Sequence, residues 1–289
     1  MKALSFGEIL WDVYAHSKYI GGAPLNFAAH LARHGDEVYM ASAVGSDELG
    51  ELALRQLRAW NVLSRFVSVC EQKPTGTCTV NLDAGGIPSY TLAEDTAFDS
   101  ITCPDCTDGF DLLYFGTLAL RNKNNLDSLK GLLNRCGFNT ILADVNLRAP
   151  FYTQQVVAFT AQTARIIKIS LEELPQTARL LGINFTEPSA FSKALASKFA
   201  NLSLIIISLG EQGAYAFDCV KNREYISKAV TVPVCSTVGA GDSFCAAFIH
   251  RYFADADIQS SLDYAVRLAG FVVSEQAAVP DYPDGLIRL

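Results

Sequence analysis

The composition of this 289-residue chain limits what the protein can be. Half of its residues are hydrophobic and 18% are charged, which is typical of a globular protein with a large buried core. The net charge of −7 disfavours a surface for nucleic acid or an anionic membrane, but allows a small anionic ligand in a locally positive pocket. No apolar run reaches membrane-spanning length, and no signal peptide is recognisable. We therefore expect a cytoplasmic protein whose eight cysteines are reduced.

Short apolar runs alternate with helical patterns along the chain. The runs predict buried strands at 3–10, 37–44, 112–115, 140–144, 165–169 and 202–208. The spacing of apolar residues predicts helices at 24–33, 47–60, 124–136, 171–181, 190–200, 242–253 and 260–276. This alternation predicts a single α/β domain over residues 1–289, with a doubly wound, mostly parallel sheet flanked by helices.

Residues 77–95 interrupt this alternation. Polar and apolar residues alternate over 79–82 and 89–92, and Ala84-Gly85-Gly86 supplies a turn between them, which predicts an exposed hairpin. Residues 13–20 are also β-like. Together, about 12–21 and 75–97 could form a small β-sheet lid that projects from the main body, and an ordinary edge hairpin is the alternative.

The cysteines and histidines are not spaced as metal ligands. Cys103 and Cys106 have CxxC spacing, but no second pair lies nearby in the sequence. His30 and His34 share one face of a predicted helix without an evident third ligand. We interpret the cysteine pair as incidental and the histidines as packing residues.

The stretch STVGAGDSF, from Ser236 to Phe244, lies between a β-like run at 225–234 and a predicted helix. A glycine-rich loop at a helix N-terminus exposes backbone N–H groups that favour phosphate. The loop lacks the lysine of GxxxxGK(S/T), and Phe244 takes the place of the last glycine of GxGxxG. A carboxylate beside bound phosphate is unfavourable, so Asp242 either caps the helix or acts as a base. The residues alone leave both interpretations open.

Four segments, in order along nearly the whole chain, resemble the signatures of the ribokinase-like (PfkB) carbohydrate kinases. They are 21–35, which begins GGAPLN; 45–50, which has the form GxDxxG; SLGEQG at 208–213; and the glycine loop at 236–242. The resemblance implies a ribokinase-like α/β fold with a small β lid. The GGAPLN form, and Asp144-Val145-Asn146-Leu147-Arg148, are similar to the fructokinase branch.

The resemblance implies a kinase that uses ATP and Mg²⁺ to phosphorylate a sugar CH₂OH, with conversion of D-fructose to fructose 6-phosphate favoured. Ribokinase, 2-keto-3-deoxygluconate kinase and nucleoside kinase activities are alternatives within the family. A non-catalytic sugar or nucleotide sensor on the same fold is another alternative. A dinucleotide oxidoreductase is disfavoured, because the N-terminal GxGxxG is missing.

The resemblance also implies roles for individual residues. Asp242 would take the proton of the attacking hydroxyl, and the amides of Gly239, Ala240 and Gly241 would hold the transferring phosphoryl group. The sugar would be bound by Asp12, Gly22, Asn26, Asn146 and Arg148, with a contribution from the loop of Asp47. ATP would be bound by Lys168, Ser208, Gly210, Gly213, Val238, Gly239 and Gly241, and by segments 230–234 and 277–280. Glu173 would act on Mg²⁺ through water.

Two positions depart from the family pattern. Ser236 replaces an aspartate that helps related enzymes to hold a monovalent cation, so we expect weak or absent activation by K⁺. Ser170 replaces the asparagine that often precedes the acidic position of Glu173, which puts the arrangement around Mg²⁺ in question. The open strand edges of the lid predict a homodimer, and we expect no nucleic-acid or membrane partner.

Overall fold

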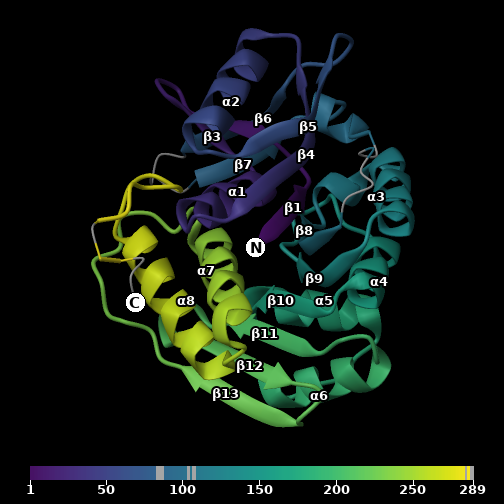
Figure 1. The fold of residues 1–289 in the computed structure, drawn as a ribbon, viewed down its shortest axis with the longest axis vertical. Helices are drawn as coiled ribbons and strands as arrows, with labels where there is room; N and C mark the ends of the chain where they lie inside the picture. The colour runs from purple at the N-terminus through teal and green to yellow at the C-terminus, as the bar shows by residue number, and fades with distance from the viewer. Residues whose placement is uncertain (83–87, 103–104, 106–108, 284, 287–289) are drawn as a thin grey trace.

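The computed structural model describes residues 1–82, 88–102, 105, 109–283 and 285–286. The turn expected at 84–86 and the cysteines Cys103 and Cys106 lie outside these residues. A large sheet with helices on both faces forms the body of the molecule, and a smaller sheet lies beside it (Figure 1).

The main sheet has nine strands in the spatial order β13-β12-β11-β10-β9-β8-β1-β4-β5 among the described residues. In chain order they are β1 (Lys2–Phe6), β4 (Glu37–Gly45), β5 (Leu63–Cys70), β8 (Phe110–Gly116), β9 (Phe138–Asp144), β10 (Ile166–Ser170), β11 (Leu204–Ser208), β12 (Ala214–Asp218) and β13 (Arg223–Ser227). All neighbours from β11 to β5 run parallel, and β12 is antiparallel to both β11 and β13. In β1, Ala3 packs into the core on one face, whereas Leu4 and Phe6 pack into the other. Burial on both faces explains why these strands are continuous apolar runs.

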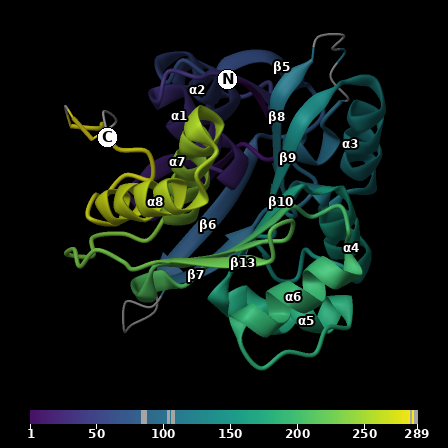
Figure 2. The ribbon, with the colours of Figure 1, turned by 60° about the horizontal axis from the view of Figure 1, so that its bottom comes forward.

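Helices cover each face of this sheet. One face carries α1 (Ala23–Arg33), α2 (Glu48–Ala59), α7 (Ala240–Asp255) and α8 (Ile258–Val273). The other carries α3 (Lys123–Arg135), α4 (Gln154–Thr163), α5 (Leu174–Leu181) and α6 (Pro188–Lys198). Figure 2 shows α7 and α8 side by side, with α5 and α6 on the far side of the sheet. The predicted doubly wound, mostly parallel sheet is confirmed. No helix in the described part of the chain is long and apolar enough to cross a membrane.

The smaller sheet has the order β3-β2-β6-β7. Its strands are β2 (Leu10–Val13), β3 (Lys18–Gly21), β6 (Gly76–Leu82) and β7 (Pro88–Leu92). Leu10 and Cys78 pack with Phe98 and Leu118 in a small core of their own. Asp12 is paired in register with Cys78, so its side chain lies on the same face as this core.

Three sequence expectations need correction. The β-like run at 225–234 forms a strand only as far as Ser227, and residues 228–239 are irregular. Pro233 within that run has no N–H to donate to a strand ladder. The strand expected at 3–10 ends at Phe6, and the chain enters the smaller sheet at Leu10. Cys136 is disulfide-bonded rather than reduced, which spacing could not reveal because connectivity depends on the fold.

Candidate functional site

The predicted site residues come from the carboxyl ends of parallel strands and from two helix N-termini. β9 ends at Asp144, and Lys168 in the middle of β10 is paired in register with it. α1 begins after Gly22, and α7 begins after Gly239. Open α/β sheets bind their ligands at the carboxyl edge of the strands, so the arrangement agrees with the predicted location.

The glycine loop leaves several backbone amides unpaired. Gly239 has φ 81°, and a Cβ there would lie 2.5 Å from the carbonyl oxygen of Ala278, so this position requires glycine. The Val238 amide donates to Ser236 Oγ at 3.3 Å. The amides of Gly241 and Asp242 donate to no acceptor within the described residues. These groups, at the positive end of the α7 dipole, can bind an anion. We call residues 236–242 the anion loop.

Asp242 lies in the first turn of α7 and is 8% exposed. Its Oδ2 accepts a hydrogen bond from Asn26 Nδ2 at 2.8 Å, and no side chain caps the N-terminus of α7. Burial raises the pKa of the Asp242 carboxyl above its usual value, although Asn26, Lys168 and Arg148 act in the opposite direction. The capping interpretation is therefore disfavoured, and a carboxylate with increased basicity suits a general base.

Lys168 brings a buried positive charge to the anion loop. A Cβ on Gly241 would lie 3.2 Å from Lys168 Nζ. The same Nζ forms an ion pair with Asp144 Oδ1 at 3.1 Å, and both side chains are buried. Burial disfavours the charged amine, but the neighbouring Asp144 carboxylate outweighs this and raises the pKa of Lys168. Lys168 thus keeps its charge beside the place where phosphate would bind.

Two of the predicted sugar-binding residues, Asn26 and Arg148, lie close to Asp242, and Arg148 also lies close to Asp12. Asn26 contacts Asp242 directly, and the Gly22 carbonyl accepts the Asn26 amide at 2.9 Å. Arg148, which follows β9, is exposed, and its charge lowers the pKa values of both Asp242 and Asp12. Burial nevertheless raises the pKa of Asp12 overall. Asn146, with φ 37°, lies in the same segment as Arg148.

Asp47 is occupied by the fold rather than directed toward a ligand. Its carboxylate accepts hydrogen bonds from the Gly50 amide, the Thr75 amide and Thr75 Oγ1 at 2.8, 2.8 and 2.6 Å. Burial would raise the pKa of Asp47, but these hydrogen bonds outweigh it and lower the pKa. Asp47 therefore caps α2 and ties it to the start of β6, which gives the GxDxxG segment a structural role.

Glu173 also uses its carboxylate within the chain. Its Oε2 accepts the Ser170 amide at 2.8 Å, and its Oε1 accepts the Leu147 amide. No cluster of three or more histidine, cysteine or acidic side chains suited to a metal ion occurs among the described residues. Mg²⁺ commonly keeps several waters and is bound by one or two carboxylates plus substrate phosphates. The residues present fit an ion brought by a nucleotide, and the water-mediated role of Glu173 stays a prediction.

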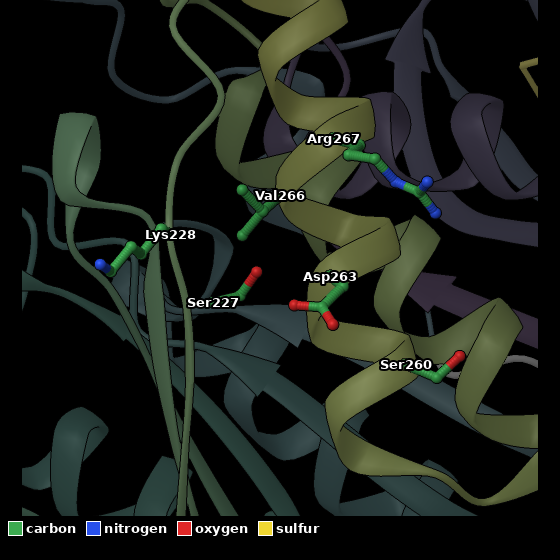
Figure 3. Close-up of a pocket in the computed structure, with 6 residues that line it drawn as sticks. All are labelled: Ser227, Lys228, Ser260, Asp263, Val266 and Arg267. Atoms are coloured by element: carbon green, nitrogen blue, oxygen red, sulfur yellow. The ribbon is translucent and has the colours of Figure 1, made fainter.

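Several residues predicted to bind ATP lie at the end of β11 and in the turn that follows it. Ser208 ends β11, Gly210 begins a short helical turn, and Gly213 packs against the Ser227 carbonyl. A cavity of about 470 Å³ follows, lined by Ser227, Lys228, Ser260, Asp263, Val266 and Arg267 (Figure 3). None of these six lining residues was predicted from the sequence, because no local pattern links β13 with α8.

The cavity and the anion loop share α8 as one wall. The carbonyl oxygen of Val273, at the end of α8, accepts the amides of Cys235 and Ser236 at 2.9 and 3.2 Å. Val266 lies two turns earlier, about 10 Å away along the helix axis. An extended ligand with an anionic end could therefore reach both places.

Glu8 is a buried acid that sequence reasoning overlooked. It is 2% exposed, and its Oε2 has no hydrogen-bond partner among the described residues. Burial and the nearby Asp242 raise the pKa of Glu8 to about 7, although its own backbone amide, Arg148 and the Ala23 amide lower it. Its position just beyond the end of β1, at the edge of the sheet where ligands bind, was the one available signal.

Comparisons with known proteins agree on the family. Residues 3–284 match the family model described as pfkB family carbohydrate kinase. The chain is 30% identical over 246 residues to a Pyrococcus horikoshii protein named as a sugar kinase, covering 83% of this chain and 75% of that one. It is 25% identical over 283 residues to a fructokinase of Vibrio alginolyticus, covering 91% and 88%.

Solved structures share the fold. A Xylella fastidiosa fructokinase with bound ATP gives a TM-score of 0.82 at 19% identity, covering 96% of this chain and 94% of that one. A Salmonella enterica aminoimidazole riboside kinase, complexed with aminoimidazole riboside and an ATP analog, gives 0.83 at 21% identity, covering 99% and 98%. The expected ribokinase-like fold, with a mostly parallel sheet and a smaller separate sheet, is confirmed.

Proposed function

This chain belongs to the PfkB family of carbohydrate kinases and is a sugar phosphotransferase, and from this premise we propose that it transfers the γ-phosphoryl group of ATP to the CH₂OH group of D-fructose. The observation that carries the proposal is the placement of Asp242. Asn26 holds this buried carboxylate at the start of α7, beside amides that donate to no other group in the described chain. A base thus lies next to an anion site, as phosphoryl transfer to a hydroxyl requires.

In the proposed reaction, the sugar hydroxyl oxygen attacks the γ-phosphorus. Its O–H proton passes to a carboxylate oxygen of Asp242, and the bond from the γ-phosphorus to the β–γ bridging oxygen breaks to release ADP. The amides of Gly239, Gly241 and Asp242 and the ammonium of Lys168 stabilise the charge on the phosphoryl oxygens. The Ala240 amide, which the sequence also assigned to the phosphoryl group, donates to the Thr237 carbonyl oxygen at 3.3 Å instead. The Asn26 hydrogen bond keeps the carboxylate oriented toward the acceptor. When bound, Mg²⁺ would neutralise charge on the phosphates.

The sugar would bind between Asp242 and the smaller sheet. Polyols need both donors and acceptors, which Asp12, Asn26 and Arg148 supply. Segments of about 12–21 and 75–97, which include β3, β6, β7 and the second half of β2, would act as a lid that excludes water. The 470 Å³ cavity along α8 would receive the nucleoside end of ATP, while its phosphates reach the anion loop.

A panel of acceptors tests this proposal. We expect ADP release from Mg-ATP in the presence of D-fructose, with a product identified as fructose 6-phosphate by its mass and by NMR, which distinguishes it from fructose 1-phosphate. Turnover with ribose, 2-keto-3-deoxygluconate or a nucleoside instead would replace the acceptor and keep the reaction. Binding of nucleotide with no turnover on any acceptor would contradict the proposed reaction and favour a sensor.

A nucleoside is the second candidate acceptor, because the smaller sheet presents tyrosines. Tyr19 is 50% exposed and Tyr90 is 59% exposed, and the strand register places both on the face that carries Asp12. Tyr14 contacts Tyr19 edge to face, with ring centroids 5.8 Å apart. Exposed rings could stack on a base. A kcat/KM for a nucleoside that exceeds the value for fructose would favour this reading.

A further inference from the structure

A histidine inside α1 joins this helix to the segment that follows α8. His30 is fully buried. The sequence suggested only a packing role for it, but the structure shows that both ring nitrogens have polar partners. Its Nε2 lies 2.9 Å from the Ala278 carbonyl oxygen, and its Nδ1 contacts the hydroxyl of Tyr282. Both partners belong to residues 278–282, which pass beside α1 after the end of α8 (Figure 1). We call residues 278–282 the C-terminal strap.

The chemistry of the partners fixes the direction of both hydrogen bonds. A carbonyl oxygen only accepts, so Nε2 carries the hydrogen and donates it to Ala278. Nδ1 then accepts the Tyr282 O–H. Burial lowers the pKa of His30 to about 3, which agrees with a neutral ring that stays in this tautomer over the physiological range.

The strap in turn lies against the anion loop. A Cβ on Gly239 would lie 2.5 Å from the Ala278 oxygen and 3.0 Å from its Cα, so the two backbones are in close contact. The oxygen that meets Gly239 is the same atom that accepts the His30 hydrogen bond. His30 therefore holds in place the Ala278 carbonyl oxygen, which lies directly against Gly239 of the anion loop.

The same helix also reaches the base. Asn26, which binds Asp242, precedes His30 by four residues and so lies on the same face of α1, one turn away. The strap has further contacts with α1, since Arg33 pairs with Asp281 at 2.9 Å. One helix thus holds Asp242 with Asn26 and the nucleotide side of the site with His30.

We propose that His30 is a positioning residue that holds the C-terminal strap against the anion loop and thereby sets the affinity for the nucleotide. This inference rests on the proposed function, because it assigns ATP phosphates to the anion loop. It predicts an effect on ATP that is separate from any effect on the sugar. A residue that only fills space in the core would show no such separation.

The test compares His30→Leu, His30→Gln and Tyr282→Phe with a matched control, Tyr264→Phe. The Tyr264 hydroxyl donates at 2.9 Å to His34, the residue that follows α1, so the control removes a tyrosine hydroxyl whose hydrogen bond, among the described residues, is to His34 and not to His30. For each variant, we would measure KM for ATP, KM for the sugar, and the Kd of a non-hydrolysable ATP analogue without sugar.

We expect His30→Leu to raise KM for ATP and the analogue Kd by about tenfold, and Tyr282→Phe by about fivefold, with KM for the sugar within about twofold of wild type. His30→Gln should raise KM for ATP and the analogue Kd less than His30→Leu does, since the glutamine amide can still donate to the Ala278 carbonyl oxygen. Tyr264→Phe should leave all three within about twofold.

An unchanged analogue Kd in folded Tyr282→Phe would overturn the inference, as would an equal rise in KM for the sugar. Tyr282→Phe keeps the test valid if His30→Leu does not fold. If the wild type phosphorylates no acceptor, the proposed function fails, but the analogue titration still decides the role of His30.

Discussion

Asp242 and Asn26 are 216 residues apart in the chain, yet their side chains share a hydrogen bond. The sequence singled out Asp242 because a carboxylate after a phosphate-type loop needs an explanation. The family resemblance named Asn26 only as a sugar-binding residue, and its hydrogen bond to Asp242 was not predicted, since no local pattern connects α1 with α7. Glu8 escaped notice because it has no motif, and only the fold buries it beside Asp242. A functional residue can therefore be predicted where it belongs to a recognisable loop, but side-chain contacts between distant elements cannot.

The burial of the Glu8 carboxyl leads to a prediction about how stability depends on pH. An unfolded glutamate ionises near its ordinary pKa of 4.5, whereas the native carboxyl keeps its proton up to about pH 7. Between these two pKa values the native state binds more protons than the unfolded state. The free energy of unfolding therefore falls as the pH rises from 4.5 to 7, and it stays lower above pH 7. This loss is about 3 kcal/mol. Glu8→Gln should remove it, so the free energy of unfolding should change less between pH 5 and pH 8.

Denaturant unfolding at pH 5 and pH 8 measures this effect. Glu94→Gln, at an exposed position, is the matched control and should keep the wild-type pH dependence. If Glu8→Gln has the same pH dependence as wild type, then Glu8 is ionised in the native protein, and the account of this buried acid is wrong.

At the scale of elements, long buried strands and amphipathic helices were predictable, because burial on both faces of the sheet imposes continuous apolar runs. The end of β13 could not be predicted, because the valines within 228–238 fit a strand pattern, whereas the chain there is irregular. Several of them, including Val230, Val234 and Val238, are exposed. This segment leads along α8 into the anion loop, so tertiary contacts with α8 override local β propensity.

The anion loop carries a prediction about monovalent cations. Ser236 offers one neutral oxygen, and it already accepts the Val238 amide at 3.3 Å. A neutral hydroxyl is a weaker cation ligand than a carboxylate, so replacing Na⁺ by K⁺ at constant ionic strength should barely change the turnover rate. Ser236→Asp should make the rate depend on K⁺. A severalfold activation of the wild type by K⁺ would contradict this.

At the scale of the whole molecule, the two sheets place the candidate sugar site between a rigid body and a smaller, separate surface. The sequence predicted both sheets, since the hairpin alternation of 79–92 differs visibly from the buried strands. It did not predict the cavity beside α8, whose lining comes from residues without a shared pattern. The smaller sheet also leaves β3 and β7 paired on one side only, within the described residues.

These open edges predict self-association. Unpaired strand edges offer N–H and C=O groups to another chain, so we expect a homodimer that joins smaller sheets. Sedimentation at micromolar concentration should show the dimer mass. The Ala93 amide donates to Thr77 of β6, and N–H groups alternate in direction along an antiparallel strand, so the Tyr90 N–H points away from β6 toward the open edge. Tyr90→Pro should weaken the dimer if that edge is used, because proline removes this N–H. A sedimentation profile with monomer alone would rule the dimer out.

The proposed reaction depends on Asp242 as its base, so Asp242→Asn is the decisive variant. Asparagine keeps the size of the side chain and an oxygen for the Asn26 hydrogen bond, but it cannot accept the proton. We expect kcat for ADP release with the preferred sugar to fall by about 10²–10⁴-fold, while the Kd of a non-hydrolysable ATP analogue does not rise, because the variant removes a negative charge beside the phosphates. A variant that retains more than about a tenth of the wild-type kcat would contradict the account.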